Sequence, residues 1–120
     1  MRFNNLLKII ASSITILVLS ACGGNELGLD EEKVENATKA RAIKQNELKE
    51  KDYKEADIEV VKVCEAVRIG EEEYGFDGEY LIFWQTTDGD YKRQFVMEDD
   101  YEVGYGTQRL EPIEDRCHIP

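Results

Sequence analysis

The pattern of apolar and polar positions divides this chain of 120 residues into three parts. Residues 9–19 are apolar apart from three hydroxyl side chains, and residues 30–55 are polar and rich in Ala, Lys and Glu. From residue 57 on, β-branched and aromatic residues alternate with polar ones. The length allows one domain. We therefore expect an α+β fold over 30–120: an N-terminal helix, then an antiparallel sheet of three to four strands over about 57–110.

The helix is predicted over about residues 30–55, a segment without Gly or Pro. Asp30 is a suitable N-cap, and Glu31 and Glu32 fall in the first turn, where the helix dipole favours acidic side chains. The apolar stripe is narrow and consists of Val34, Ala37, Ile43 and Leu48. Such a helix either rests lightly on the sheet or stands away from it as a stalk.

The first strand is predicted at 58–69, where β-branched residues are dense. Val60 and Val61 interrupt the alternation, so a bulge is expected there; a helical interpretation of this segment stays open. The three glycines of Gly70–Gly78 indicate a loop.

A hairpin is the clearest structural signal in the chain. Two alternating runs, 79–86 and 91–97, flank Asp88-Gly89, which is typical of a two-residue turn. The register then pairs Trp84 with Arg93, Ile82 with Phe95 and Tyr80 with Met97 on the expected core face, and Leu81 with Val96 and Phe83 with Gln94 on the other. We expect a cation–π contact between Arg93 and Trp84. An acidic turn at 98–100, a weak last strand at 101–110 and a returning segment at 111–120 complete the prediction.

The first 22 residues have the pattern of a secretory signal, although a buried core helix is the alternative. Arg2 and Lys8 precede the apolar run without any acidic residue, and the run is too short to span a bilayer. Leu19-Ser20-Ala21-Cys22 resembles the lipobox of bacterial lipoproteins. The resemblance implies that residues 1–21 are removed and that Cys22 receives a diacylglycerol and often an N-acyl chain such as palmitate, which together form a stable anchor.

The lipoprotein resemblance also implies a location in the cell envelope. In double-membraned bacteria, Asp after the lipidated Cys retains the protein at the inner membrane. Gly23 stands there, which implies the outer membrane, facing the periplasm; a single-membraned host is the alternative. Three glycines within 23–28 predict a flexible tether over 22–29.

The net charge excludes some partners. Residues 1–21 hold two of the 15 basic residues and none of the 26 acidic ones, so the mature chain carries −13. This charge argues against nucleic acid and against anionic headgroups, which leaves the lipid as the membrane contact. It attracts cationic proteins at long range, although solubility alone also explains it.

Cys64 and Cys117 remain after lipidation of Cys22, and an oxidising compartment favours a disulfide between them. The alternatives are two buried thiols or a redox pair, which lacks the CxxC spacing. The mature chain has no Ser, and its one His is His118. A Ser-His-Asp site is therefore impossible, and we expect no enzyme. No zinc or EF-hand spacing is present, so we expect no metal and no cofactor.

A protein partner in the envelope is the remaining expectation. The candidate contact residues are acidic and aromatic residues of the two loops, namely Glu71, Glu72, Glu73, Tyr74, Phe76, Asp99, Asp100 and Tyr101. These aromatic residues equally fit a role in covering the edges of a small core. The expected function is a lipid-anchored module that binds, or inhibits, a cationic protein such as a lysozyme. The alternative is a non-catalytic accessory or exclusion lipoprotein of an envelope assembly.

Overall fold

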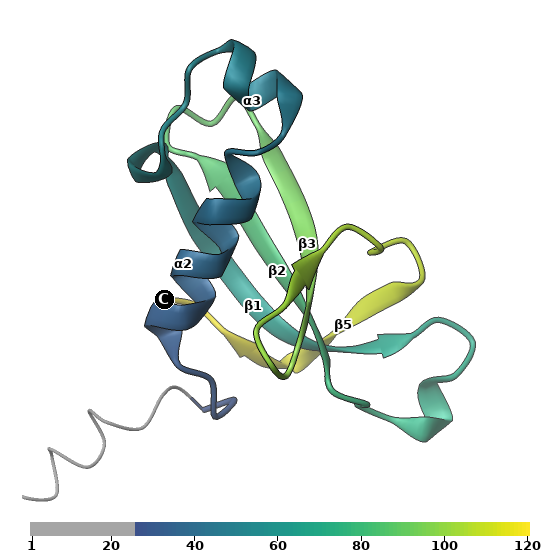
Figure 1. The fold of residues 1–120 in the computed structure, drawn as a ribbon. Coiled ribbons are helices and arrows are strands. Elements are labelled where there is room, and N and C mark those ends of the chain that lie inside the picture. Colours follow the sequence, from purple (N-terminus) through teal and green to yellow (C-terminus); the bar gives the residue numbers. More distant parts are fainter. Residues whose placement is uncertain (1–25) are drawn as a thin grey trace, which may run out of the picture.

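The computed structural model describes residues 26–120, so the predicted signal peptide and Cys22 lie outside the described residues. The helical elements are α2 (Glu31–Ala42), α3 (Asn46–Glu50) and the 3-10 turns η1 (Glu55–Asp57) and η2 (Glu72–Tyr74). The strands are β1 (Ile58–Arg68), β2 (Glu79–Thr86), β3 (Lys92–Glu98), β4 (Val103–Gly104) and β5 (Leu110–His118). Helix α2 lies across one face of the sheet, and α3 covers one end of it (Figure 1).

All strand pairs are antiparallel, in the order β4-β3-β2-β1-β5. The antiparallel sheet is confirmed, but it has five strands and not three to four. The predicted strand at 101–110 is wrong: only Val103–Gly104 pair there, and the last strand begins at Leu110. β5 escaped prediction because it is charged and contains Pro112. An edge strand tolerates proline, since one side of its backbone needs no partner.

The predicted long helix ends early. Asp30 caps α2 as expected, because its Oδ1 accepts hydrogen bonds from the backbone of Glu32 (3.0 Å) and Lys33 (3.3 Å). The helix stops at Ala42, and the chain turns into the short α3. This turn lets both Ala42 and Leu48 be fully buried over the same sheet, which one straight helix does not allow. The helix is docked, and the stalk alternative is wrong.

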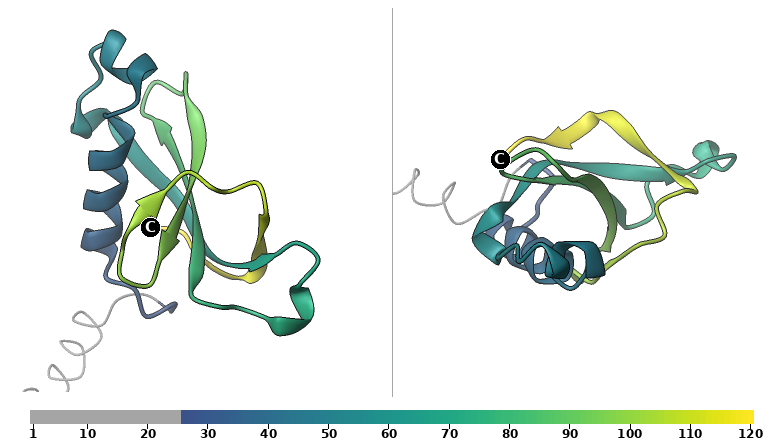
Figure 2. Two further views of the ribbon diagram at one scale, coloured as in Figure 1. Left: turned by 45° about the vertical axis from the view of Figure 1, so that its right-hand side comes forward. Right: turned by 90° about the horizontal axis from the view of Figure 1, so that it is seen from above.

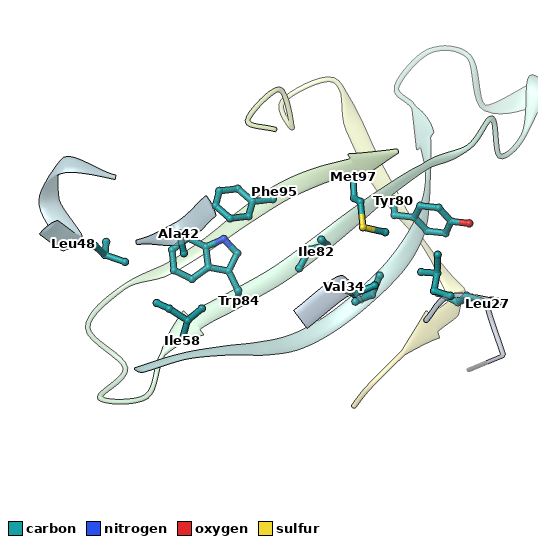
Figure 3. Packing of buried hydrophobic residues seen from close by; sticks show 12 residues of the cluster. Leu27, Val34, Ala42, Leu48, Ile58, Tyr80, Ile82, Trp84, Phe95 and Met97 are labelled. Atoms are coloured by element: carbon teal, nitrogen blue, oxygen red, sulfur yellow. The ribbon is translucent and has the colours of Figure 1, made fainter. Parts of the chain in front are cut away.

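The hairpin register is confirmed for every predicted pair, from Trp84 opposite Arg93 to Tyr80 opposite Met97. The predicted face is the core, where Ile82, Phe95 and Met97 are completely buried (Figure 3). The connection is wider than two residues, because Thr86 and Tyr91 form its last backbone hydrogen bond (2.9 Å).

Arg93 contacts Tyr91 and Glu47 in place of the expected Trp84. The guanidinium of Arg93 lies 5.2 Å from the ring centroid of Tyr91 and forms a 3.4 Å ion pair with Glu47 of α3. Trp84 is instead buried in the core and packs against Phe95, with ring centroids 5.1 Å apart.

β1 carries the predicted bulge, since its pairing with β2 shifts between Val60 and Lys62. The disulfide is also confirmed: Cys64 and Cys117 are bonded and lie directly opposite each other in β1 and β5. It fastens the last strand to the edge of the sheet. Seen from above, β5 and α2 lie on opposite sides of the molecule (Figure 2).

The segment that precedes α2 belongs to the core. Leu27 is 8% exposed and Leu29 is 3% exposed, and both pack with the hydrophobic residues under the helix. Residues 26–29 are therefore not the flexible tether that the glycines predicted, because burying two leucines outweighs the freedom of Gly28. The remainder of that predicted tether lies outside the described residues.

Candidate functional site

Two connections meet at the end of the sheet where α2 begins. The β1–β2 connection (residues 69–78) and the β3–β4 turn (99–102) lie on either side of the pair Glu79 and Glu98, which are opposite each other in β2 and β3. The turn contacts the start of the helix, because the Tyr101 hydroxyl accepts a hydrogen bond from the backbone N–H of Asp30 (2.9 Å). We call this region the acidic end, defined by Asp77, Glu79, Glu98 and Asp99.

The acidic end surrounds an open hollow of about 240 Å³, lined by its four acidic residues together with Arg68 and Gly78. Four carboxylates and one guanidinium give it a formal charge of −3. Arg68 forms a 3.1 Å ion pair with Glu79. Like charges directly opposite each other in a sheet destabilise it, so Glu79 and Glu98 lie in an unfavourable arrangement that one arginine only partly offsets.

Gly78 lies where the two connections approach each other. Gly78 has φ +84°, and a Cβ built there would lie 3.6 Å from the Asp99 carboxylate. The positive φ would strain any other residue here, whereas 3.6 Å from Asp99 is an ordinary van der Waals distance. Glycine therefore suits the backbone conformation of the residue that joins Asp77 to β2.

Two aromatic side chains project beside the acidic end. Tyr74 is 75% exposed, whereas Phe76 is 37% exposed and rests edge-on against the core residue Tyr80, with centroids 5.0 Å apart. Phe76 thus partly covers the core edge, which was one of the two interpretations of these aromatics. Tyr74 is the more accessible of the two for a partner.

The predicted glutamates of the loop are exposed on η2 and near it. The Glu72 carboxylate accepts a hydrogen bond from the Gly70 backbone N–H (3.1 Å). This hydrogen bond holds the pKa of Glu72 below its ordinary value of 4.5, since the charged form is the better acceptor. Glu72 therefore stays ionised at neutral pH.

The predicted residues of the β3–β4 turn are partly engaged within the molecule. Asp100 accepts a hydrogen bond from the Glu102 backbone N–H (3.0 Å), and the ring of Tyr101 lies 5.4 Å from the Lys33 ammonium. Tyr101 is half-buried and holds the turn against the helix. Its role in binding a partner stays a prediction, as do those of Asp99 and Asp100.

The predicted contact residues include Asp99 of the hollow but not the other charged residues that line it, namely Arg68, Asp77, Glu79 and Glu98. The hairpin register contained a usable signal, because extending it downward from Tyr80 and Met97 pairs Glu79 with Glu98. No pattern in the sequence predicted that Asp77 lies beside them, since its position depends on the course of the ten-residue, glycine-rich β1–β2 connection.

His118, at the end of β5, is half-buried and holds a structural position. Its Nδ1 lies 2.8 Å from a carboxylate oxygen of Glu26, and its Nε2 contacts Glu31. The backbone N–H of Glu26 and the His118 ring lower the pKa of Glu26. Cys117 is disulfide-bonded and is not available as a nucleophile beside this ring.

The described residues include no group of three or more His, Cys, Asp or Glu side chains placed to hold a metal ion. Within residues 26–120, no helix is long and apolar enough to cross a membrane. Comparison with known proteins finds no matching family model, no matching curated protein and no matching solved structure.

Proposed function

We propose that this chain is a lipid-anchored, extracytoplasmic protein-binding module whose acidic end binds a cationic protein. A lysozyme is a concrete example of such a partner. The anchor in this proposal is the lipid on Cys22, and the location is the outer membrane facing the periplasm in a double-membraned host. The proposed module is non-catalytic and needs no cofactor.

The acidic end is the single observation that carries the proposal. Four carboxylates line one hollow, and among its lining residues only Arg68 balances them. A lysine or arginine of a partner would reduce the repulsion between these carboxylates. Such a cation would lie between Glu79 and Glu98 and turn a repulsion into two attractions. The exposed ring of Tyr74 beside the hollow adds the aromatic contact that often anchors a protein interface.

The proposed anchor also restricts where the partner would be found. Glu26 is only four residues after Cys22, and four residues span at most about 14 Å. The acidic end lies at the same end of the molecule as residues 26–30 (Figure 1). A lipid on Cys22 would therefore hold the hollow close to the membrane, which favours a cationic partner at the membrane surface.

The test is binding of the full chain to lysozyme over a series of salt concentrations. We expect the affinity to fall as salt rises, because exposed charges are screened. Replacing Glu79, Glu98 and Asp99 by Gln, Gln and Asn should weaken binding about tenfold, at up to about 1 kcal/mol for each ion pair.

A matched control removes the same charge elsewhere. Glu50→Gln, Glu55→Gln and Asp90→Asn neutralise three exposed acids far from the hollow, and this variant should bind almost as the wild type does. If both triple variants lose affinity equally, net charge alone explains the binding. If neither does, the acidic end is not the site.

The accessory or exclusion lipoprotein is the second candidate. The β1–β2 connection exposes Ile69 (57%) as well as Tyr74, which is apolar surface of the kind that a permanent assembly buries. A partner held in this way would survive high salt. Replacing Ile69 and Tyr74 by Ser would then release it, whereas the three neutralised acids would not.

A further inference from the structure

The face of the sheet that α2 does not cover is only half covered by other parts of the chain. Toward β5, it forms a second small core of Ala66, Leu81 and Leu110, all of which are buried. Phe83 and Val96 border this core and remain half-buried. Val61, displaced by the bulge in β1, is 42% exposed.

A groove lies on this uncovered half, between the bulge of β1 and the start of β3. It is an open hollow of about 240 Å³, lined by Val61, Phe83, Trp84, Gln85, Lys92, Arg93 and Gln94. On the uncovered face the lining has apolar surface, two amides, the Lys92 cation and no carboxylate, whereas the side chains of Trp84 and Arg93 lie on the core face. This composition is unexpected in a chain with 26 acidic and 15 basic residues.

Lysine side chains border the groove without acidic partners. The Lys62 ammonium lies 4.8 Å from the ring centroid of Phe83. Within residues 26–120, neither Lys62 nor Lys92 has a carboxylate within ion-pairing distance, whereas Arg93 is paired with Glu47. Glu59 lies nearby, but its carboxylate accepts a hydrogen bond from Gln85 (2.9 Å).

We infer that this groove is a docking surface for an acidic segment of a partner protein that also carries an apolar side chain. The carboxylates of the segment would pair with Lys62 and Lys92, and its apolar side chain would cover Phe83 and Val61. The side-chain amide of Gln94 offers a donor and an acceptor to an extended backbone, and Gln85, whose Nε2 donates to Glu59, offers its carbonyl oxygen. The inference concerns a different surface from the acidic end and does not depend on its function.

A second copy of this chain fits the groove less well. Its own acidic and aromatic segment, residues 71–77, is exposed and has suitable chemistry. That segment follows β1 at the opposite end of the sheet from the groove, and Phe83 already lies about 13 Å along β2 from Glu79. If the lipid anchor proposed above holds two copies on one membrane, they would present the loop and the groove at different heights, and this step rests on that proposal.

The test uses the full chain, labelled with ¹⁵N, and a short synthetic peptide in which glutamates flank one phenylalanine. We expect the peptide to shift the amide resonances of Val61, Phe83 and Gln94. A peptide with lysines in place of the glutamates should not shift them. Lys62→Glu combined with Lys92→Glu should weaken binding of the acidic peptide about tenfold.

The control variant combines Lys44→Glu and Lys49→Glu, which change the net charge equally from exposed positions around α3. It should lose much less affinity than the groove variant. Equal losses, or peptide shifts confined to other residues, would overturn the inference. Self-association of the full chain that Lys62→Glu and Lys92→Glu abolish would identify a second copy as the occupant and overturn the choice of partner.

Discussion

Two open hollows of about 240 Å³ lie along the same strand, and they have opposite character. Glu79 of β2 borders the acidic one, and Phe83, four residues further, borders the groove with the two lysines. Both side chains are on the same face, because strand residues alternate with a period of two. The difference comes from the flanking segments. The glycine-rich β1–β2 connection and the β3–β4 turn bring Asp77 and Asp99 to one end, and a bulge displaces Val61 at the other.

The two hollows also differ in whether the strand that carries them pairs with β5. Arg68 is opposite Leu110 of β5, so the acidic end is attached to the last strand. The groove is built on parts of β1, β2 and β3 that do not pair with β5. The disulfide should therefore matter more to the acidic end than to the groove.

The largest expected effect is that of removing this disulfide with Cys64→Ala and Cys117→Ala. The cysteines are 53 residues apart, and closing such a loop stabilises the folded state by about 4 kcal/mol. Unfolding by denaturant should show this loss. Hydrogen exchange should accelerate in β5 and at Arg68 more than at Phe83; equal acceleration at both would contradict the difference in support.

An intermediate effect is expected from Arg68→Gln, which sharpens the contrast in charge. The variant loses an ion pair whose arginine is nearly half exposed, so its free energy of unfolding should fall by less than about 1 kcal/mol. The formal charge of the hollow becomes −4, so affinity for lysozyme should rise several-fold at low salt. An unchanged affinity would show that the hollow does not contact the cationic partner.

The smallest expected effect concerns the hairpin turn beyond the groove. Asp88 accepts hydrogen bonds from the hydroxyls of Thr86 (2.6 Å) and Tyr53 (2.6 Å), which lower the pKa of Asp88 to about 2 from 3.8. Because its folded-state pKa is depressed, its contribution to stability is complete above about pH 4. That contribution is lost as the pH falls toward 2.

The measurement is the difference in unfolding free energy between the wild type and Asp88→Asn from pH 2 to pH 6. This difference should shrink as the pH falls through the lower part of the range. The hydrogen bond from the Tyr53 hydroxyl to Asp88 also raises the pKa of Tyr53 to about 12 from 10. The contribution of Tyr53 to stability is therefore present below pH 10 and is lost as the pH rises toward 12. A difference that stays constant from pH 2 to pH 6 would contradict the assignment to Asp88.

The hairpin could be predicted because alternation and Asp-Gly together specify a register, and that register also contained the pair Glu79 and Glu98. The end of α2 could not be predicted, since it depends on placing Leu48 over a sheet whose strands follow later in the sequence. β5 could not either, because it is charged and contains Pro112, so it lacks the pattern typical of a strand. The groove depends on a bulge whose position was predicted but whose effect on Val61 was not.

The most direct measurement of the central claim is a crossed binding experiment. It measures the affinity of lysozyme and of the acidic peptide for three proteins: the full chain, the acidic-end variant (Glu79→Gln, Glu98→Gln, Asp99→Asn) and the groove variant (Lys62→Glu, Lys92→Glu). We predict that the acidic-end variant binds lysozyme more weakly and the peptide as the wild type does. The groove variant should bind the peptide more weakly and lysozyme as the wild type does. Changes in both affinities that follow only the net charge of each variant would contradict the claim of two separate surfaces.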